Sequence, residues 1–356
     1  MFFKRKNLLV LILCMVALVF TSCVKTAPDT PPAAEPTKGQ PISKSDFLLG
    51  TIVDITIYDK QDEAIIDKAM DRIREIENKM TINNAETSEI IALNEAAGTK
   101  EVKVSADTLD VLERGKYYSA LSKGRFDITV GPIVKLWNIG TDLAAVPDPK
   151  VLEEKVKLID FNKLHLDRNN LTAKLDDPNM QVDLGAIAKG YAADEVAEIL
   201  KENGVQHAII NLGGNVLTIG GNMQDGPWKI GIQDPFNPRG DFLGIITIKD
   251  KTVVTSGTYE RYFEQDGKRY HHILDPRTGY PADNEVASVS IITDKSMDGD
   301  GNSTSVLLLG LEEGMKFIES QENIEAIFIT YDKKVYITSG LKATFMVTNP
   351  EFTLMD

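Results

Sequence analysis

Two short segments in the C-terminal half hold the residues best suited to chemistry. The segment 271–279, HHILDPRTG, brings together imidazoles, a carboxylate, a guanidinium and a hydroxyl, and the segment 298–304, DGDGNST, adds further carboxylates and hydroxyls. Such groups suit a metal-assisted reaction on a phosphate, because oxygen ligands bind Mg²⁺ and the metal neutralises phosphate oxygens.

The acidic segment begins like a calcium-binding EF-hand but does not continue as one. Asp298, Asp300 and Asn302 occupy the first, third and fifth positions of such a loop. The sixth position is Ser303, where glycine is required, and the twelfth is Leu309, where a bidentate glutamate is required. These two positions exclude an EF-hand.

Asp300 and Thr304 remain as candidate metal ligands. They lie four residues apart, just before an apolar run. A helix beginning near Gly301 would place both side chains on one face at its electropositive end, where they would offer oxygen ligands to Mg²⁺. The alternative is that Asp300 only caps this helix, and the spacing alone slightly favours the cap.

The segment 183–191, DLGAIAKGY, is the second candidate for chemistry. It places a carboxylate, small residues and Lys189 where a strand turns into a helix, which would bring backbone and a cation close to a bound anion. The alternative is an ordinary helix start with Asp183 as the cap. The spacing does not decide between them.

Two other glycine-containing segments have structural alternatives. The segment 211–215, NLGGN, lies between two predicted strands and is more typical of a hairpin turn than of a phosphate-binding loop. The segment 124–132, GRFDITVGP, places Arg125 and Asp127 on either side of Phe126. It could hold a planar ligand or form a strand with an internal ion pair.

The histidines and cysteines narrow the chemistry further. His165 and His207 lie singly near predicted strands and are expected to be structural. His271 and His272 would alternate in a strand, so at most one faces a site. A Ser-His-Asp hydrolase is poorly supported without a G-x-S-x-G motif, and the only two cysteines lie in the N-terminal leader, which excludes thiol catalysis in the mature chain.

Residues 1–23 have the features of a bacterial lipoprotein signal. A basic start is followed by an apolar run over 8–20 and by Thr-Ser-Cys, which resembles a lipobox with Cys23 as the lipidated residue. Residues 24–45 are rich in Pro, Thr, Ala and Lys and predict a flexible tether. We expect an exported protein, anchored through Cys23 to the outer face of the cytoplasmic membrane; an ordinary cleaved signal is the alternative.

The remaining residues, 46–350, predict a mixed α and β unit that could be one domain or two lobes. Apolar spacing predicts helices over 66–80, 107–121, 186–203 and 311–320. Strands are predicted at 51–58 and, from 207 onward, at 208–212, 216–219, 228–233, 242–248, 252–255, 286–292, 326–331 and 334–338. Because strands and helices do not alternate regularly, an α+β fold with a strand-rich C-terminal half is expected rather than a doubly wound sheet.

The formal net charge of −14 limits the partners. An acidic body argues against nucleic acid and against close contact with anionic lipid headgroups. An anionic substrate would therefore need local compensation from Lys, Arg or a metal cation.

The ordered set of motifs resembles the ApbE family of exported, often lipidated flavin transferases. The resemblance covers about residues 46–340. It is carried by Leu49-Gly50-Thr51, Met80-Thr81, Ser88-Glu89-Ile90, Phe126 to Pro132, Asp183 to Tyr191, Gly213-Gly214-Asn215, Thr255-Ser256-Gly257, His272 to Gly279 and Asp300 to Thr304.

This resemblance implies an FAD:protein FMN transferase, which splits FAD, releases AMP and joins FMN through its phosphate to a threonine of a partner protein. It implies Mg²⁺ held by Asp300, Thr304, the carbonyl of Ala186 and Ser303, and proton transfer by His272. The implied FAD contacts are Leu49, Asn83, Arg125, Phe126, Asp127, Asp183, Lys189 and Leu274. The implied partners are flavin-bearing subunits of membrane redox complexes.

Two positions depart from the family pattern. Leu49 stands where methionine is usual, and Asn83 stands where many members have tyrosine. Loss of that aromatic ring would leave the site more open to water, so we expect some FAD hydrolysis to FMN and AMP. The competing hypotheses are a flavin- or solute-binding lipoprotein without turnover and a cation-binding structural lipoprotein.

Overall fold

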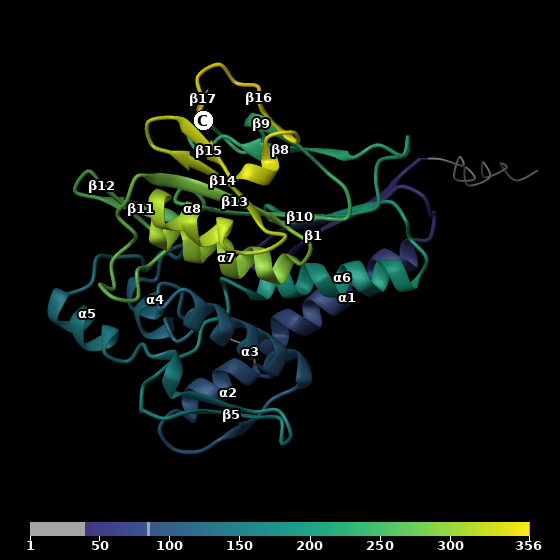
Figure 1. Cartoon of the computed structure of the whole chain (residues 1–356). Coiled ribbons are helices and arrows are strands. Elements are labelled where there is room, and N and C mark those ends of the chain that lie inside the picture. Colours follow the sequence, from purple (N-terminus) through teal and green to yellow (C-terminus); the bar gives the residue numbers. More distant parts are fainter. Residues whose placement is uncertain (1–39, 84–85, 356) are drawn as a thin grey trace, which may run out of the picture. The chain divides into compact units, whose positions relative to one another are not determined.

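The computed structural model describes residues 40–83 and 86–355 (Figure 1). These described residues form one compact unit. The predicted signal, Cys23 and most of the predicted tether lie outside the described residues. Among the described residues, no helix combines the length and apolar character needed to cross a membrane.

A mostly antiparallel sheet organises this unit. Its nine strands within the described residues have the order β1-β2-β6-β7-β10-β13-β14-β15-β17, and only the β15–β17 pair is parallel. The α+β prediction is therefore confirmed. The strands are β1 (Ile42–Leu48), β2 (Thr51–Ile57), β6 (Ala208–Leu212), β7 (Asn215–Ile219), β10 (Thr252–Gly257), β13 (Val286–Thr293), β14 (Glu325–Thr330), β15 (Lys334–Ile337) and β17 (Thr353–Leu354).

Strand β1 begins inside the segment that the sequence assigned to the tether. Residues 42–45 pair with β2 in regular register, from Ile42 opposite Ile57 to Ser45 opposite Asp54. The predicted boundary at residue 46 is therefore wrong for this segment. The reason is that β1 is an edge strand with polar residues on its open side, so it lacks the apolar run that would signal a strand.

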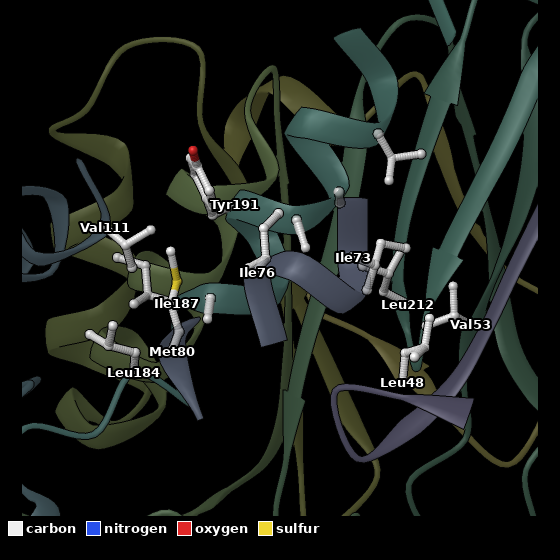
Figure 2. Close-up of a cluster of buried hydrophobic side chains, with 14 of the residues drawn as sticks. Leu48, Val53, Ile73, Ile76, Met80, Val111, Leu184, Ile187, Tyr191 and Leu212 are labelled. Carbon is white, nitrogen blue, oxygen red and sulfur yellow. The ribbon is translucent and has the colours of Figure 1, made fainter. Parts of the chain in front are cut away.

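Four helices cover one face of the sheet: α1 (Glu63–Met80), α6 (Ala188–Glu202), α7 (Ser296–Leu309) and α8 (Leu311–Glu319). The apolar spacing predicted three of them closely. Figure 2 shows the result for α1, whose Ile73, Ile76 and Met80 lie among side chains from the sheet and from the start of α6. Burying this apolar stripe fixes α6 against the sheet, and α6 carries Lys189 and Gly190.

The other face of the sheet is covered by three strands: β8 (Trp228–Gln233), β9 (Phe242–Ile248) and β16 (Phe345–Val347). Their apolar side chains pack against β10, β13, β14 and β15 in a second core. Strand β13 is consequently buried along its whole length. It forms a rigid base beneath α7.

The described residues among 81–187 form four helices joined by loops and a small sheet. The sequence predicted only one of these helices, the one after Ser105. This region contains α2 (Glu89–Glu95), α3 (Ala106–Leu121), α4 (Gly131–Trp137), α5 (Pro149–Val156), a 3₁₀ turn (Phe161–Lys163) and a small sheet of β3 (Val102–Lys103), β4 (Leu164–Asp167) and β5 (Thr172–Leu175). Figure 1 shows this region beside α6 and α7. A separate hairpin, β11 (Tyr262–Gln265) and β12 (Lys268–His271), leads into the segment 271–279, and a second 3₁₀ turn covers Ser339–Leu341.

Candidate functional site

Helix α7 begins earlier than predicted. The sequence predicts a start near Gly301, whereas the helix starts at Ser296. The first two amides, of Ser296 and Met297, donate to the carboxylate of Asp194 on α6 at 2.8 and 3.0 Å. Because the cap comes from another helix, no local signal marks this start. Asp300 lies in the second turn, so the prediction that it caps the helix is wrong.

The carboxylate of Asp300 joins three parts of the fold. It is 4% exposed, its Oδ2 accepts a hydrogen bond from the amide of Gly190 at 2.6 Å, and its Oδ1 accepts one from Asn215 Nδ2 at 2.8 Å. Gly190 is needed at this contact because a Cβ there would lie 2.3 Å from the carbonyl oxygen of Ser296. The starts of α6 and β7 and the second turn of α7 therefore meet at one carboxylate.

The electrostatics of Asp300 favour a cation beside it. Burial raises the pKa of this carboxyl above its ordinary value, and the charge of Lys189 together with the bonds from Asn215 and Gly190 only partly offsets the rise. A buried carboxylate of this kind is stabilised in its ionised form by a nearby positive charge. The predicted pairing of Asp300 with Lys189 in one site is thus present.

The bond from Gly190 to Asp300 also affects the carbonyl of Ala186. In a regular helix the amide of Gly190 would donate to the carbonyl four residues earlier, which is that of Ala186. Here it donates to Asp300, and within the described ranges no other donor reaches the Ala186 carbonyl. An unused carbonyl oxygen therefore lies in the turn just before α6, close in sequence to the amide that holds Asp300.

Three hydroxyl groups lie beside Asp300. Ser303 Oγ donates to the backbone carbonyl of Asp300 at 3.1 Å, and Ser256 Oγ on β10 lies 2.9 Å from Ser303 Oγ and 3.5 Å from Thr304 Oγ1. Ser303 is fully buried, whereas Thr304 is partly exposed. Thr304 therefore has the more accessible hydroxyl of the two, and Ser256 contacts both hydroxyls.

Asp183 does not cap α6. Its Oδ1 accepts from the amide of Gly185 at 2.7 Å within the preceding turn, and α6 starts only at Ala188 without a side-chain cap. The capping alternative is therefore wrong. Burial raises the pKa of the Asp183 carboxyl, and the charge of Arg261 partly opposes this.

The imidazole of His272 is close enough to two positive charges, those of Arg261 and Lys189, for both to act on it. Its amide and its Nδ1 face the carbonyl of Arg261 at 3.1 and 3.2 Å. Burial lowers the pKa of His272 to about 3, and the charges of Arg261 and Lys189 lower it further. The imidazole is therefore neutral near pH 7, and Nε2 can accept a proton if Nδ1 carries the hydrogen.

Arg261 was not among the predicted site residues. It lies at the base of the β11–β12 hairpin, and its side chain is exposed without an ion pair among the described residues. Its charge influences both Asp183 and His272. The T-S-G-T-Y-E-R stretch gave no spacing signal for it, because the turn that returns Arg261 toward the site is set by the hairpin.

The adjacent His271 points elsewhere. Its Nε2 lies 3.0 Å from the carbonyl of Ala282, and the side chain is buried. Only His272 faces the cluster, as the alternation predicted. His165 pairs with Asp176 at 2.5 Å and His207 contacts the carbonyl of Gly221 at 2.7 Å, so both are structural.

The segment 124–132 is neither a strand nor the site of an internal ion pair. Arg125 Nη1 donates to the carbonyl of Leu308 at 3.1 Å and lies 3.8 Å from Asp275 Oδ2, so it links the end of α7 to the segment 271–279. The carboxylate of Asp127 is used by Thr129 and by the amide of Phe161. Its side chain therefore has a structural function.

The other predicted FAD contacts are placed as follows. Phe126 and Leu274 are buried at 3% and 6% exposure, which leaves little of either side chain for a ligand. Leu49 lies in the β1–β2 turn with a positive φ of 54°, and its amide donates to Glu77 Oε1. Asn83 is exposed, and its amide donates to Thr81 Oγ1. No hydrogen bond between described residues joins Leu49 or Asn83 to Asp300.

The remaining motifs have structural functions. Gly213 and Gly214 have positive φ angles of 62° and 106° and form the predicted hairpin between β6 and β7, which places Asn215 against Asp300. Asp298 pairs with Arg114 at 2.5 Å, away from Asp300.

Within the described residues, no cluster of three or more His, Cys, Asp or Glu side chains could hold a metal.

Comparisons with known proteins agree with this arrangement. The sequence profile of the ApbE family matches residues 49–328, which include every element that meets at Asp300. The chain belongs to the ApbE family. An FAD:protein FMN transferase of Klebsiella pneumoniae is 40% identical over 314 residues, covering 88% of this chain and 97% of that protein, and one of Treponema pallidum is 36% identical over 88% and 91%.

Solved ApbE structures share the fold. The ApbE protein of Thermotoga maritima superposes with a TM-score of 0.79 at 30% identity, and the flavin transferase ApbE of Vibrio cholerae with 0.77 at 29%. Each comparison covers 86% of this chain and 99% of the other. The curated relatives of this ApbE chain are transferase enzymes, so the cluster around Asp300 is the candidate active site of a transferase.

Proposed function

We propose that this ApbE chain transfers FMN from FAD to a threonine hydroxyl of a partner protein. The threonine oxygen attacks the phosphorus of the FMN half, a new phosphoester bond forms, and the bond to the bridging oxygen breaks so that AMP leaves. The hydroxyl proton is taken up by a base. The names of the curated relatives support FAD as donor and a protein as acceptor.

The observation that carries the proposal is the contact between Asp300 and the start of α6. One buried carboxylate replaces the carbonyl of Ala186 as the partner of the Gly190 amide, and Lys189 lies in the same turn. A carboxylate, an unused carbonyl and a cation are thus gathered at a helix start. This is the set of groups that a pyrophosphate and its metal would require.

The residues present fit Mg²⁺. Asp300, Thr304 and the carbonyl of Ala186 are oxygen donors, and we propose them as its ligands, with Ser303 contributing less because its hydroxyl already bonds within α7. When bound, the metal would neutralise charge on the phosphate oxygens. Burial raises the pKa of Asp300, and a bound cation would stabilise its ionised carboxylate, which supports a metal at this position.

The chain's own residues supply the remaining chemistry. Lys189 and Arg261 both place positive charge near His272 and would hold the anionic phosphates. An anion bound there would raise the low pKa of His272 toward neutrality, which would make the imidazole a better base for the threonine proton. Of the FAD contacts that the resemblance implies, we propose that Arg125, Asp183 and Lys189 bind FAD directly and that Leu49 and Asn83 contact its more distant parts. Phe126, Asp127 and Leu274 are buried, so their side chains would support the site from within the fold.

Water can replace threonine as the nucleophile in this proposal. The exposed Asn83 stands where many family members have tyrosine, so no aromatic ring shields the flavin at that position. We therefore propose slow hydrolysis of FAD to FMN and AMP. Incubation with FAD and Mg²⁺ alone should release AMP, and a complete absence of AMP would contradict this part of the proposal.

We further propose that the protein acts outside the cytoplasm. The leader and Cys23 support export and a lipid anchor at the outer face of the cytoplasmic membrane. The acceptors would then be flavin-bearing subunits of membrane redox complexes. Labelling with a palmitate analogue should tag the wild-type chain and not Cys23→Ala, and equal labelling of both would contradict the anchor.

The proposal is tested by chromatography of nucleotides and protein after incubation with FAD. Reactions with and without Mg²⁺, and with and without a threonine-bearing acceptor, should give flavin-labelled acceptor only when all components are present, and AMP only when FAD and Mg²⁺ are both present. Retained FAD without AMP would instead indicate a binding lipoprotein. Absence of both FAD binding and AMP would leave only a structural function.

A further inference from the structure

Helices α6 and α7 each lack a side-chain cap of their own and are capped by one another. The carboxylate of Asp194 on α6 accepts the first two amides of α7. The carboxylate of Asp300 on α7 accepts the amide of Gly190 at the start of α6. The two helices therefore exchange carboxylate-to-amide contacts in both directions.

The spacing makes these two contacts parts of one unit. Asp194 follows Gly190 by four residues on α6, and Asp300 follows Ser296 by four residues on α7, so each pair lies on one face of its helix, one turn apart. Between the contacts, Gly190 packs directly on the backbone of Ser296, where even a methyl group has no room. The two contacts, one at Asp194 and one at Asp300, thus fix the position of α7 along the axis of α6.

We propose that Asp194 is a positioning residue for the active site: by holding the first turn of α7 against α6, it sets where Asp300 meets Gly190 and the carbonyl of Ala186. Asp194 touches neither substrate nor metal in this scheme. The inference rests on the proposed function because AMP release is the reaction that is measured. The contact between Asp194 and the first turn of α7 does not depend on that function.

Asp194 can exchange protons with solvent. It lines a small surface pocket, and the charged groups facing it there and on α7 are Glu198, Lys201, Asp250, Lys251, Asp294, Lys295 and Asp298. Lys251 is paired with Asp294 at 2.6 Å, and Lys295 lies 3.7 Å from Glu198. These lysines therefore compensate other carboxylates as well as Asp194.

Acidification should act on this contact with a defined sign. Burial raises the pKa of Asp194 to about 6, so lowering the pH from 7 to 5 protonates it and removes one acceptor from the pair of α7 amides. Because its folded pKa exceeds the unfolded value, this protonation favours the folded chain. Activity and stability that depend on Asp194 should therefore change in opposite directions across this range.

The test compares Asp194→Ala and Asp194→Asn with Asp148→Ala. Asp148 is a matched control because its carboxylate also accepts two amides, of Lys150 and Val151 at the start of α5. The full-length chain is assayed for the Mg²⁺ concentration that gives half-maximal AMP release from FAD. Hydrogen exchange of the Gly190 amide is measured in parallel without metal or FAD.

We expect Asp194→Ala to raise the Mg²⁺ midpoint by about tenfold or more, as loss of a residue that orients a metal ligand does. Its Gly190 amide should exchange faster, whereas Asp148→Ala should leave both values unchanged. Asp194→Asn keeps one acceptor oxygen, so its Mg²⁺ midpoint and its Gly190 exchange rate should lie between those of the wild type and Asp194→Ala. It should also lack the change in activity near pH 6.

Two results would overturn the inference. One is a folded Asp194→Ala protein with wild-type Mg²⁺ midpoint and Gly190 exchange; the other, decisive if Asp194→Ala does not fold, is an Asp194→Asn protein that keeps the wild-type pH profile and exchange rate. If the wild type itself releases no AMP, the proposed function fails, and the exchange of Gly190 in the Asp194 variants still decides whether Asp194 positions Asp300.

Discussion

Replacing Asp300 by alanine should impair the reaction more than replacing His272 by alanine. In the structure Asp300 accepts two hydrogen bonds from groups on separate elements, Gly190 and Asn215. Bonds to a charged group contribute about 1.5–3 kcal/mol each. Their loss, together with loss of the proposed metal ligand, should lower kcat/KM by about 10³ or more, since each 1.36 kcal/mol corresponds to about tenfold in rate.

His272 should contribute less. A positioned base contributes about 10²–10⁴ in rate, and most when its pKa is near the working pH. Burial and two flanking cations hold the pKa of His272 at about 3 in the free protein, which places its expected contribution near the lower end, about 10².

The assay is AMP release from FAD at saturating Mg²⁺ and acceptor, with melting temperatures to show that both variants are folded. Asp300→Ala should have the lower residual activity by about tenfold or more. Equal residual activity in two folded variants would refute the argument that the carboxylate and its metal carry most of the rate. A larger loss in His272→Ala would refute it as well.

Three further variants test single contacts. Asn215→Ala removes a bond that lowers the pKa of Asp300, so the pKa should rise further and the Mg²⁺ midpoint should increase by about tenfold in activity titrations; an unchanged midpoint would contradict the contact. Arg261→Ala removes a charge that lowers the pKa of His272, so NMR titration should show a higher pKa; a lower or unchanged value would exclude the proposed proximity. Gly190→Ala forces a methyl group onto α7 and should cost about 1–3 kcal/mol of unfolding free energy in denaturant titrations, whereas wild-type stability would mean that the helices can separate there.

The parts of the fold that the sequence predicted are those with local signals. Helix α1 has apolar residues at regular helical spacing, and α3 follows Ser105, whose side chain caps it as expected. The hairpin at Gly213-Gly214 follows from two residues that adopt positive φ readily.

The parts that were missed depend on contacts between distant segments. Helix α7 starts in a stretch rich in Ser, Asp and Gly, which are poor helix formers, and its cap comes from Asp194 about one hundred residues earlier. Arg261 reaches the site only because a hairpin turns the chain back. Residue spacing along the sequence predicts neither contact.

The candidate site shows the same division. Asp300, Thr304, Lys189 and His272 were selected by residue type and by resemblance to the family, and the structure places Lys189 where its charge acts on both Asp300 and His272. Asn215 and Ser256 lie in motifs shared with the family, but their contacts with Asp300 and Ser303, like the contact of Asp194 with α7, were not predicted from the sequence. Their function follows only from the packing of α6, α7 and the sheet.

The central claim is that the chain moves FMN from FAD to a protein. The most direct measurement is the mass of a threonine-bearing acceptor after incubation with the chain, FAD and Mg²⁺, together with the AMP released. We predict an acceptor heavier by one FMN phosphoester, with AMP in at least equal amount and neither product without Mg²⁺. An acceptor of unchanged mass in the presence of bound FAD would contradict the claim.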